Sequence, residues 1–367
     1  MKKNLILLLV STLLSLLMLE IGLRVFTVFP VNLSSNKILD EKLGYKVDPT
    51  LNPDIDDAGF RNSELKSIAN LVALGDSHTF GFNVASEDSW PQQLARMLNK
   101  TVYNFGVGGY GILQYQFLMN EAIKMKPEHI VLGLYLPNDL GDVCWTLREV
   151  DFWKIWAKKN DINIEVCPPY KERKLLDKSW RSFMVNNTAL GSIVKHFIWT
   201  PMKYRIKQTE WSRIAVVVSD ERNKTFINYK RIVSHESAMD LGRPDIALAF
   251  EIAKEFVTEA STKADFNHIS FIVLFIPSKE RVFYKYLVAQ GVQLPQSYHQ
   301  LAKNERELVT EMSLFLEKIG IVYVDALPYM VEVLHKFGHV YPVKDDGHPL
   351  KIGYGAYAKA VYDILAR

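Results

Sequence analysis

Three residue types in this chain are those that nucleophilic acyl chemistry requires. Ser77 stands in the run Gly-Asp-Ser-His-Thr, directly after the apolar stretch 71–74, and His348 stands near the far end of the chain. Asp345 and Asp346 precede that histidine by three and two residues. A neutral hydroxyl is a poor nucleophile, so a histidine must accept its proton and a carboxylate must hold the histidine in the correct tautomer. If the fold brings these side chains together, the chain is able to form an acyl-serine intermediate.

The elements that would position these residues alternate between strand and helix. Short apolar runs predict strands that are covered on both faces, and amphipathic stretches between them predict helices. Such alternation is typical of a three-layer α/β/α fold, in which helices cover both faces of a mostly parallel sheet and right-handed crossovers join the strands. The predicted strands are 71–74, 101–105, 130–136, 269–276 and 321–324, and the principal helices are 89–98, 113–124, 247–260 and 354–365.

Several polar or glycine residues follow the predicted strands, where an open α/β sheet places its active site. Ser77 follows the first strand, Gly109 follows the second and Asn138 follows the third. The cluster that ends in His348 precedes the last helix. Four separate segments are therefore expected to meet at one rim of the sheet.

These segments resemble the four sequence blocks of the SGNH, or GDSL-type, hydrolase and acyltransferase superfamily, in the same order. Gly75–Ser77 is similar to the nucleophile block, although the next residue is histidine where leucine is usual. Asn104–Gly109 is similar to the glycine block, Pro137–Asp139 to the asparagine block and Asp345–His348 to the Asp-x-x-His block. The resemblance implies the flavodoxin-like α/β/α fold of that superfamily.

The resemblance also implies a role for each residue of the predicted triad. Ser77 is the expected nucleophile and His348 the expected base. Asp345 has the family's usual spacing from the histidine and is the favoured partner, while Asp346 has the spacing of some relatives and is the alternative. His78 is expected to face the entrance of the site or solvent, and no role is assigned to it.

An oxyanion hole is the second implication of the resemblance. Its donors are expected to be the backbone N–H groups of Ser77 and Gly109 and the side-chain amide of Asn138, because a tetrahedral intermediate needs donors that are already in place. A structural alternative exists for each residue. Ser77 is also suited to cap the following helix, and Asn138 to form a turn with Asp139.

The N-terminal residues are predicted to be a targeting signal. Two lysines precede an apolar run that extends from Leu5 toward Phe29, interrupted by Glu20 and Arg24. No small-residue cleavage site follows, so the pattern favours an uncleaved transmembrane anchor with the rest of the chain outside the cytoplasm, over a cleaved signal peptide.

The two cysteines of the chain bear on the compartment in which it folds. Cys144 and Cys167 are its only cysteines. In an exported protein both lie in an oxidising space, where we expect them to form a disulfide, with two buried thiols as the alternative.

The predicted organisation is one α/β domain with a large insertion between the third and fourth strands. Residues 1–29 are the expected anchor and 30–69 a linker. The core comprises 70–139 and 244–367, and the insertion 140–243 separates its two parts. The insertion interleaves tryptophan with lysine and arginine, which fits a lid with its own small core, a surface at a membrane interface, or platforms for sugar rings.

Other classes of protein are disfavoured. A net charge of +3 over 367 residues is too small for a nucleic-acid surface. The segment Gly106–Gly111 fits G-x-G-x-x-G, but it follows the second predicted strand rather than the first, and a dinucleotide would leave Ser77, Asn138 and His348 unexplained. Metal-ligand spacings, a Walker loop and a G-x-S-x-G elbow are absent from the sequence. We therefore expect neither cofactor nor metal.

The sequence as a whole predicts an extracytoplasmic serine esterase that acts on O-acyl esters, with short acyl groups and a cell-envelope glycan as the expected substrate. One alternative is an O-acyltransferase that works with a membrane acyl-donor protein, and Ile276–Glu280 resembles a segment of some such enzymes. Another alternative is a non-catalytic envelope-binding protein that retains the fold, although intact Ser77, Asn138 and His348 argue against it.

Overall fold

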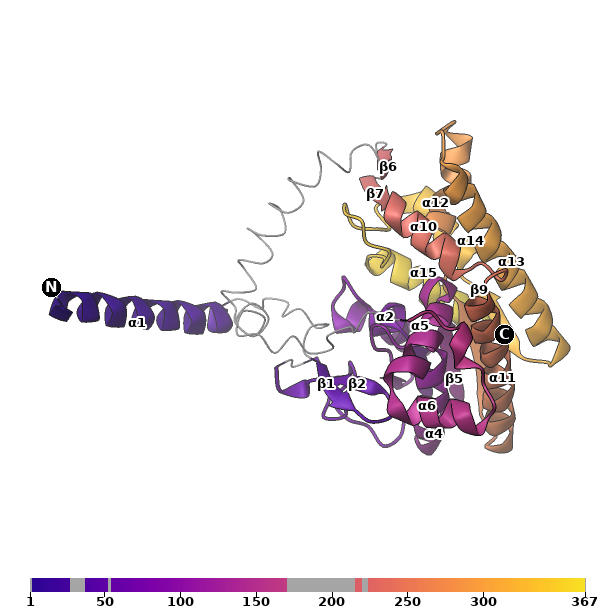
Figure 1. Ribbon diagram of the computed structural model, residues 1–367, viewed down its shortest axis with the longest axis horizontal. Helices are drawn as coiled ribbons and strands as arrows, with labels where there is room; N and C mark the ends of the chain where they lie inside the picture. The colour runs from indigo at the N-terminus through magenta and orange to yellow at the C-terminus, as the bar shows by residue number, and fades with distance from the viewer. Residues whose placement is uncertain (1, 27–36, 52–53, 170–214, 220–223, 367) are drawn as a thin grey trace. The chain divides into compact units, whose positions relative to one another are not determined.

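The structure is a computed structural model that describes residues 2–26, 37–51, 54–169, 215–219 and 224–366 (Figure 1). Leu39–Lys46, Asp54–Lys171 and Ile214–Arg367 belong to one compact unit, which contains the whole central sheet. Helix α1 (Lys2–Phe26) and the short 3₁₀ helix η1 (Pro49–Leu51) lie outside that unit.

The central sheet has five parallel strands in the order β4-β3-β5-β8-β9. This is the flavodoxin-like order, in which the chain leaves the first strand in one direction and then returns past it to add the remaining strands on the other side. The rim between β3 and β5 is therefore the switch point where ligands bind in such sheets. The strands are β3 (Leu71–Gly75), β4 (Val102–Asn104), β5 (His129–Leu134), β8 (Ser270–Phe275) and β9 (Val322–Asp325).

The interior strands form because apolar side chains cover both of their faces. Every residue of β3 is buried, and so is nearly every residue of β5 and β8. Continuous apolar runs of this kind are typical of parallel strands between two helical layers. The strands predicted from sequence are confirmed, each within two residues of its observed ends.

Helices cover both faces of the sheet (Figure 1). Helices α3 and α15 pack against each other, with α14 beside α15, and α11 packs against α4 and α5. Right-handed crossovers place α3 and α15 on one face of the sheet and α4, α11 and α13 on the other. The bounds are α3 (Trp90–Leu98), α4 (Ile112–Lys124), α5 (Leu136–Glu149), α11 (Pro244–Phe266), α12 (Lys279–Ala289), α13 (Gln296–Lys318), α14 (Leu327–Phe337) and α15 (Lys351–Leu365).

The segment expected to be a linker is instead part of the fold where the structure describes it. Strands β1 (Lys37–Asp40) and β2 (Gly44–Val47) form a two-stranded sheet. Arg61 is buried, and its guanidinium donates to the carbonyl oxygens of Phe80, Gly81 and Val84. The linker prediction is therefore wrong for this stretch, because it also depends on buried polar side chains such as Arg61, whose partners are backbone groups that no hydrophobic period reveals.

The predicted insertion contains ordered elements on both sides of a segment that the structure does not describe. Helix α5 continues past the third strand into it, and its later part ends in α10, which packs on α13. Residues 170–214, which include Trp180, Trp199 and Trp211, lie outside the described residues. The remaining elements there are α6 (Asp151–Lys159), η3 (Ile164–Val166), β6 (Ala215–Ser219), β7 (Lys224–Asn228) and α10 (Tyr229–Ala238).

The N-terminal apolar run forms helix α1. Across the parts of the chain that the structure describes, no helix combines the length and the apolar character needed to cross a bilayer. The transmembrane anchor expected over residues 1–29 is therefore not supported.

Candidate active site

The predicted nucleophile stands at the N-terminus of the four-residue helix α2 (Ser77–Phe80), where β3 ends. Asp76 caps this helix: its carboxylate accepts a 2.8 Å hydrogen bond from the His78 N–H and a 3.2 Å bond from Ser77 Oγ. Burial raises the pKa of Asp76 above its ordinary value. Gly75 allows the tight turn, since a Cβ there would lie 2.1 Å from Thr79 Oγ1. Ser77 is thus part-exposed, whereas the residues on either side of it in the strand-to-helix turn are buried.

His348 meets Ser77 as the sequence predicted, across 271 residues of chain. Its Nε2 lies 2.7 Å from Ser77 Oγ, shorter than the 3.2 Å contact between that hydroxyl and Asp76. The imidazole is therefore placed to accept the serine proton. His348 lies in the loop between α14 and α15, three residues before α15 begins.

Asp346, rather than Asp345, contacts the histidine. Asp346 Oδ1 lies 2.7 Å from His348 Nδ1 and also accepts from the His348 backbone N–H at 3.0 Å. Burial raises the pKa of Asp346, but the hydrogen bonds and charge of His348 outweigh it and bring the pKa well below its ordinary value. The preference for Asp345 is wrong, because Asp345 accepts from Asn228 N and lies 3.7 Å from the Arg231 guanidinium. The alternative spacing is the one observed.

The glycine loop after β4 lies beside the nucleophile. A Cβ on Gly108 would lie 3.6 Å from Ser77 Cβ, which puts the loop in contact with the serine. Gly109 has φ +83°, and a Cβ there would lie 2.6 Å from Tyr45 Oη. The Tyr45 hydroxyl donates to Gly108 O at 2.8 Å, and Tyr45 O accepts from Tyr110 at 2.6 Å. Tyr45 therefore fixes the loop that is expected to supply an oxyanion donor, a role that the sequence did not reveal because Tyr45 stood in the presumed linker.

Asn138 lies in the first turn of α5, directly after β5. Its Nδ2 donates to Asp142 at 3.1 Å, and its side chain acts to lower the pKa of the Asp76 carboxyl, against the larger effect of burial. Asp139 is buried and accepts from Tyr135 N at 2.7 Å and from the Tyr115 hydroxyl at 2.8 Å, which anchors this turn. Asn138 thus acts on Asp76, the residue before Ser77, at the rim where the strand order reverses.

His78 is buried, contrary to the expectation that it faces the entrance or solvent. Its ring lies between those of Tyr135 and His348, with centroid distances of 4.1 and 4.7 Å. Burial, and then the nearby positive charges of His348 and Arg231, bring the pKa of His78 well below its ordinary value. His78 therefore packs against His348 as a neutral ring. Its side chain is buried because of its place in the turn of α2.

The predicted disulfide is confirmed: Cys144 and Cys167 are bonded. Cys144 lies on α5, the helix that begins beside Asn138, and Cys167 follows η3. The bond ties the helix that starts at the site to the end of η3, within the insertion.

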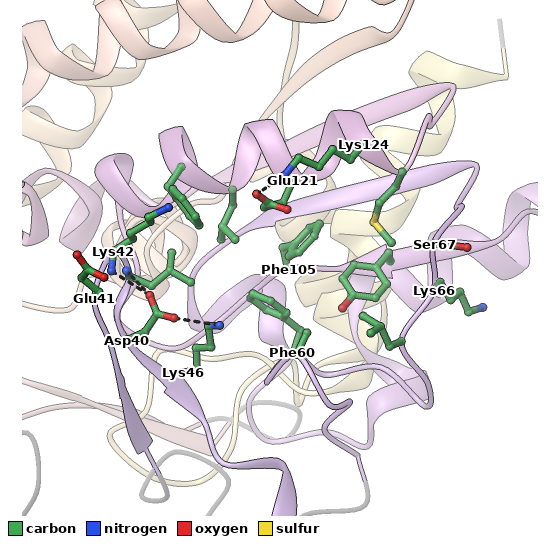
Figure 2. Close-up of a pocket in the computed structure, with 17 residues that line it drawn as sticks. Asp40, Glu41, Lys42, Lys46, Phe60, Lys66, Ser67, Phe105, Glu121 and Lys124 are labelled. Carbon is green, nitrogen blue, oxygen red and sulfur yellow. Dashed lines mark hydrogen bonds and ion pairs between the residues drawn. The ribbon is translucent and has the colours of Figure 1, made fainter. Parts of the chain in front are cut away.

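A cavity lies away from these residues. Its volume is about 640 Å³. Figure 2 shows its lining, with Phe60 and Phe105 among the aromatic side chains and Lys42 and Lys46 among the charged ones. Neither Ser77 nor His348 lines it. Among the described residues, no group of three or more histidine, cysteine or carboxylate side chains is arranged to hold a metal ion.

Comparison with known proteins gives structural likenesses only. No family model and no curated protein sequence matches the chain. Among solved structures, a lipolytic protein of the G-D-S-L family from Desulfitobacterium hafniense is 13% identical with a TM-score of 0.39, over 80% of this chain and 98% of that one. An acetyl-xylooligosaccharide esterase from Geobacillus is 11% identical with a TM-score of 0.39, over 83% and 97%. A GDSL-like lipase from Bacteroides thetaiotaomicron is 10% identical with a TM-score of 0.37, over 81% and 87%. These three structures are described as GDSL-type lipolytic proteins and an esterase.

Proposed function

We propose that the chain is a serine esterase that cleaves O-acyl esters through an acyl intermediate on Ser77. The observation that carries this proposal is the continuous contact Ser77–His348–Asp346, with 2.7 Å at both steps. A hydroxyl, an imidazole and an ionised carboxylate in this order form the arrangement that activates a serine for attack on a carbonyl carbon.

The first half of the reaction acylates the serine. Ser77 Oγ attacks the ester carbonyl carbon while its proton passes to His348 Nε2, and the carbonyl electrons move onto the oxygen. Asp346 accepts the Nδ1–H of His348 and stabilises the imidazolium. Collapse of the tetrahedral intermediate breaks the ester C–O bond, and the leaving alkoxide takes the proton from Nε2. The acyl group is then bonded to Ser77.

The second half returns the enzyme to its starting state. Water attacks the acyl carbon and gives a proton to His348 Nε2, and the second intermediate expels Ser77 Oγ, which recovers that proton. In both intermediates we assign the oxyanion to the backbone N–H groups of Ser77 and Gly109 and the Asn138 amide. Donors of this kind, held in place before the reaction, typically contribute about 100- to 1000-fold each in rate.

We further propose that the enzyme works outside the cytoplasm on short-chain acyl esters of a glycan. The Cys144–Cys167 bond supports the compartment, because disulfides persist in oxidising spaces and are rare in the cytosol. The part-exposed Ser77 supports a substrate that approaches from the surface rather than one enclosed in a deep cavity.

The test is hydrolysis of a short-chain aryl ester by the full chain beside Ser77→Ala. We expect turnover in the wild type, a loss of about 10⁴-fold or more in the variant, and labelling of Ser77 by a fluorophosphonate probe. A wild-type protein that neither hydrolyses the ester nor reacts with the probe would sink the proposal. Labelling without turnover would instead indicate a transferase that needs an acceptor other than water.

A further inference from the structure

The loop that carries Asp346 is held by the second part of the insertion. Thr225 Oγ1 of β7 donates to the carbonyl oxygen of Pro342 at 2.9 Å, and the backbone N–H of Asn228 donates to Asp345 at 3.2 Å. These contacts join residues 117 positions apart in the chain. The segment β7–α10 is therefore a support for the triad loop.

Lys279 completes this support from beneath the loop. It is fully buried, and its Nζ donates to the carbonyl oxygens of Phe226, Lys344 and Asp346 at 2.9, 3.1 and 3.1 Å. One ammonium thus ties β7 to the backbone on both sides of Asp345. Burial, together with the charge of Arg231, lowers the pKa of Lys279 to about 8.

Arg231 of α10 also contacts the loop. Its guanidinium lies 3.1 Å from Glu280 and 3.7 Å from Asp345. Glu280 is fully buried; burial raises its pKa, but the charges of Arg231 and His235 outweigh this and lower it to about 2. Arg231 therefore keeps two carboxylate partners and is held in one place by them.

The guanidinium also packs directly on the backbone of Gly347. A Cβ built on Gly347 would lie 1.5 Å from Arg231 Nη2 and 2.7 Å from its Cζ, so glycine is needed for this approach. Gly347 stands between Asp346 and His348, the two residues whose side chains must meet at 2.7 Å. A shift of the Gly347 peptide changes the position of both at once.

From this geometry we propose that Arg231 is a positioning residue of the triad, acting through Gly347. Asp345 and Glu280 hold the guanidinium, the guanidinium fixes the Gly347 peptide, and that peptide sets the contact between Asp346 and His348. Asp345 thus serves the triad without touching the histidine. The inference rests on the proposed esterase function and assigns part of the insertion to the catalytic machinery.

A double-mutant cycle tests this proposal in the full chain. Arg231→Gln removes the guanidinium, and Gly347→Ala displaces it by a methyl group while keeping the charge. A misplacement of about 1 Å in a catalytic group typically costs about 100-fold in rate, so each variant is expected to lose about 100-fold in kcat with little change in KM. If both act through one contact, the double variant loses no more than the worse single one, whereas independent effects would multiply to about 10⁴-fold.

The matched control is Arg281→Gln. Arg281 is also a part-buried arginine between two carboxylates, 3.1 Å from Asp325 and 3.8 Å from Glu305, with 11% of its side chain exposed against 17% for Arg231. Both arginine variants are expected to lower the melting temperature, but only Arg231→Gln is expected to lower kcat. The downfield proton resonance of the His348 Nδ1–H, measured by NMR, is expected to weaken in Arg231→Gln and to persist in Arg281→Gln.

The outcomes separate this inference from the function beneath it. An active wild type in which Arg231→Gln matches Arg281→Gln in kcat, or in which the two losses multiply, overturns the positioning role alone. A wild type that is inert to both ester and serine probe overturns the proposed function and this inference with it. If Arg231→Gln does not fold, Gly347→Ala decides alone: wild-type kcat overturns the proposal, and a loss of about 100-fold in a folded protein supports it.

Discussion

The imidazole of His78 packs against the imidazole of His348, with 4.7 Å between ring centroids and 37° between ring planes. The proposed catalytic base is thus in contact with a second histidine that burial keeps neutral. A neutral ring fills the space beside the base without placing a like charge there when His348 takes up the serine proton.

His78 makes the stability of the fold sensitive to mild acid. Its folded-state pKa lies well below the unfolded value of about 6.5, so the unfolded chain binds the extra proton. The stabilisation is fully present above pH ~6.5 and is lost as the pH falls below it, at a slope approaching about 1.4 kcal/mol per unit. We expect His78→Phe to flatten this part of the curve, measured by urea unfolding between pH 7 and 5. His268→Asn, at an exposed position with φ +57°, is the control and is expected to keep the wild-type slope; equal slopes in His78→Phe and wild type would contradict the prediction.

The two neighbouring aspartates are expected to differ sharply in activity. Asp346→Asn removes the carboxylate that holds the His348 tautomer and is expected to lower kcat by about 10⁴-fold. Asp345→Asn keeps an oxygen for the Asn228 N–H and removes no group that touches the histidine, so its loss is expected to stay within the ~100-fold that misplacement alone causes. Steady-state kinetics of both variants on one aryl ester make the comparison. A larger loss in Asp345→Asn than in Asp346→Asn would show that the observed triad is not the working one.

Asn138 is expected to act on the transition state rather than on binding. Asn138→Ala removes an amide donor beside Asp76 and Ser77, so kcat is expected to fall by about 100- to 1000-fold while KM changes little. Asn160→Ala on the exposed end of α6 is the control, because its amide donates to Trp156 O within its own helix turn. A rise in KM at constant kcat would instead make Asn138 a ground-state binding residue.

Tyr45 is expected to matter for both stability and rate. Tyr45→Phe leaves the carbonyl of Gly108 without its hydroxyl donor, which is expected to lower the free energy of unfolding by about 1–3 kcal/mol. Because the same loop contains Gly109, kcat is expected to fall as well. Tyr323→Phe, which removes a hydroxyl bonded to Glu317 at the surface, is the comparison. Equal effects of the two substitutions on kcat would contradict a role for Tyr45 in holding the glycine loop.

The disulfide is expected to stabilise the fold by about 3 kcal/mol, since it closes a loop of 23 residues. The double variant Cys144→Ser/Cys167→Ser is expected to unfold at a lower urea concentration than the oxidised wild type. Adding reductant should bring the wild type to the level of the variant and leave the variant unchanged. A wild type that unfolds at the same urea concentration with and without reductant would contradict this value.

The buried strands and the identities of Ser77 and His348 could be predicted from the sequence for physical reasons. Strands covered on both faces leave continuous apolar runs, and chemistry at their carboxyl ends leaves polar residues at fixed places. The choice between Asp345 and Asp346 could not be made, because Arg231 and Asn228, more than a hundred residues away, decide which carboxylate turns toward the histidine.

The structure of the segment before β3 could not be predicted from sequence for a different reason. Its structural residues, Tyr45 and Arg61, act through hydrogen bonds to carbonyl oxygens of distant turns. Such bonds have no period along the chain. His78 shows the same limit, because only the folded turn reveals that its side chain points inward.

The buried guanidinium of Arg61 has a consequence for where the catalytic domain can be cut. It donates to the carbonyl oxygens of Phe80, the last residue of helix α2, and of Gly81 and Val84, which follow that helix, so the turn that presents Ser77 is completed by residues upstream of β3. A truncated protein that starts at residue 70 would keep every strand of the central sheet and the whole triad. It would nevertheless lose Arg61, which holds the turn after Ser77, and Tyr45, which holds the glycine loop. The shortest competent fragment of this chain must therefore begin ahead of Tyr45, well before the first residue that does chemistry.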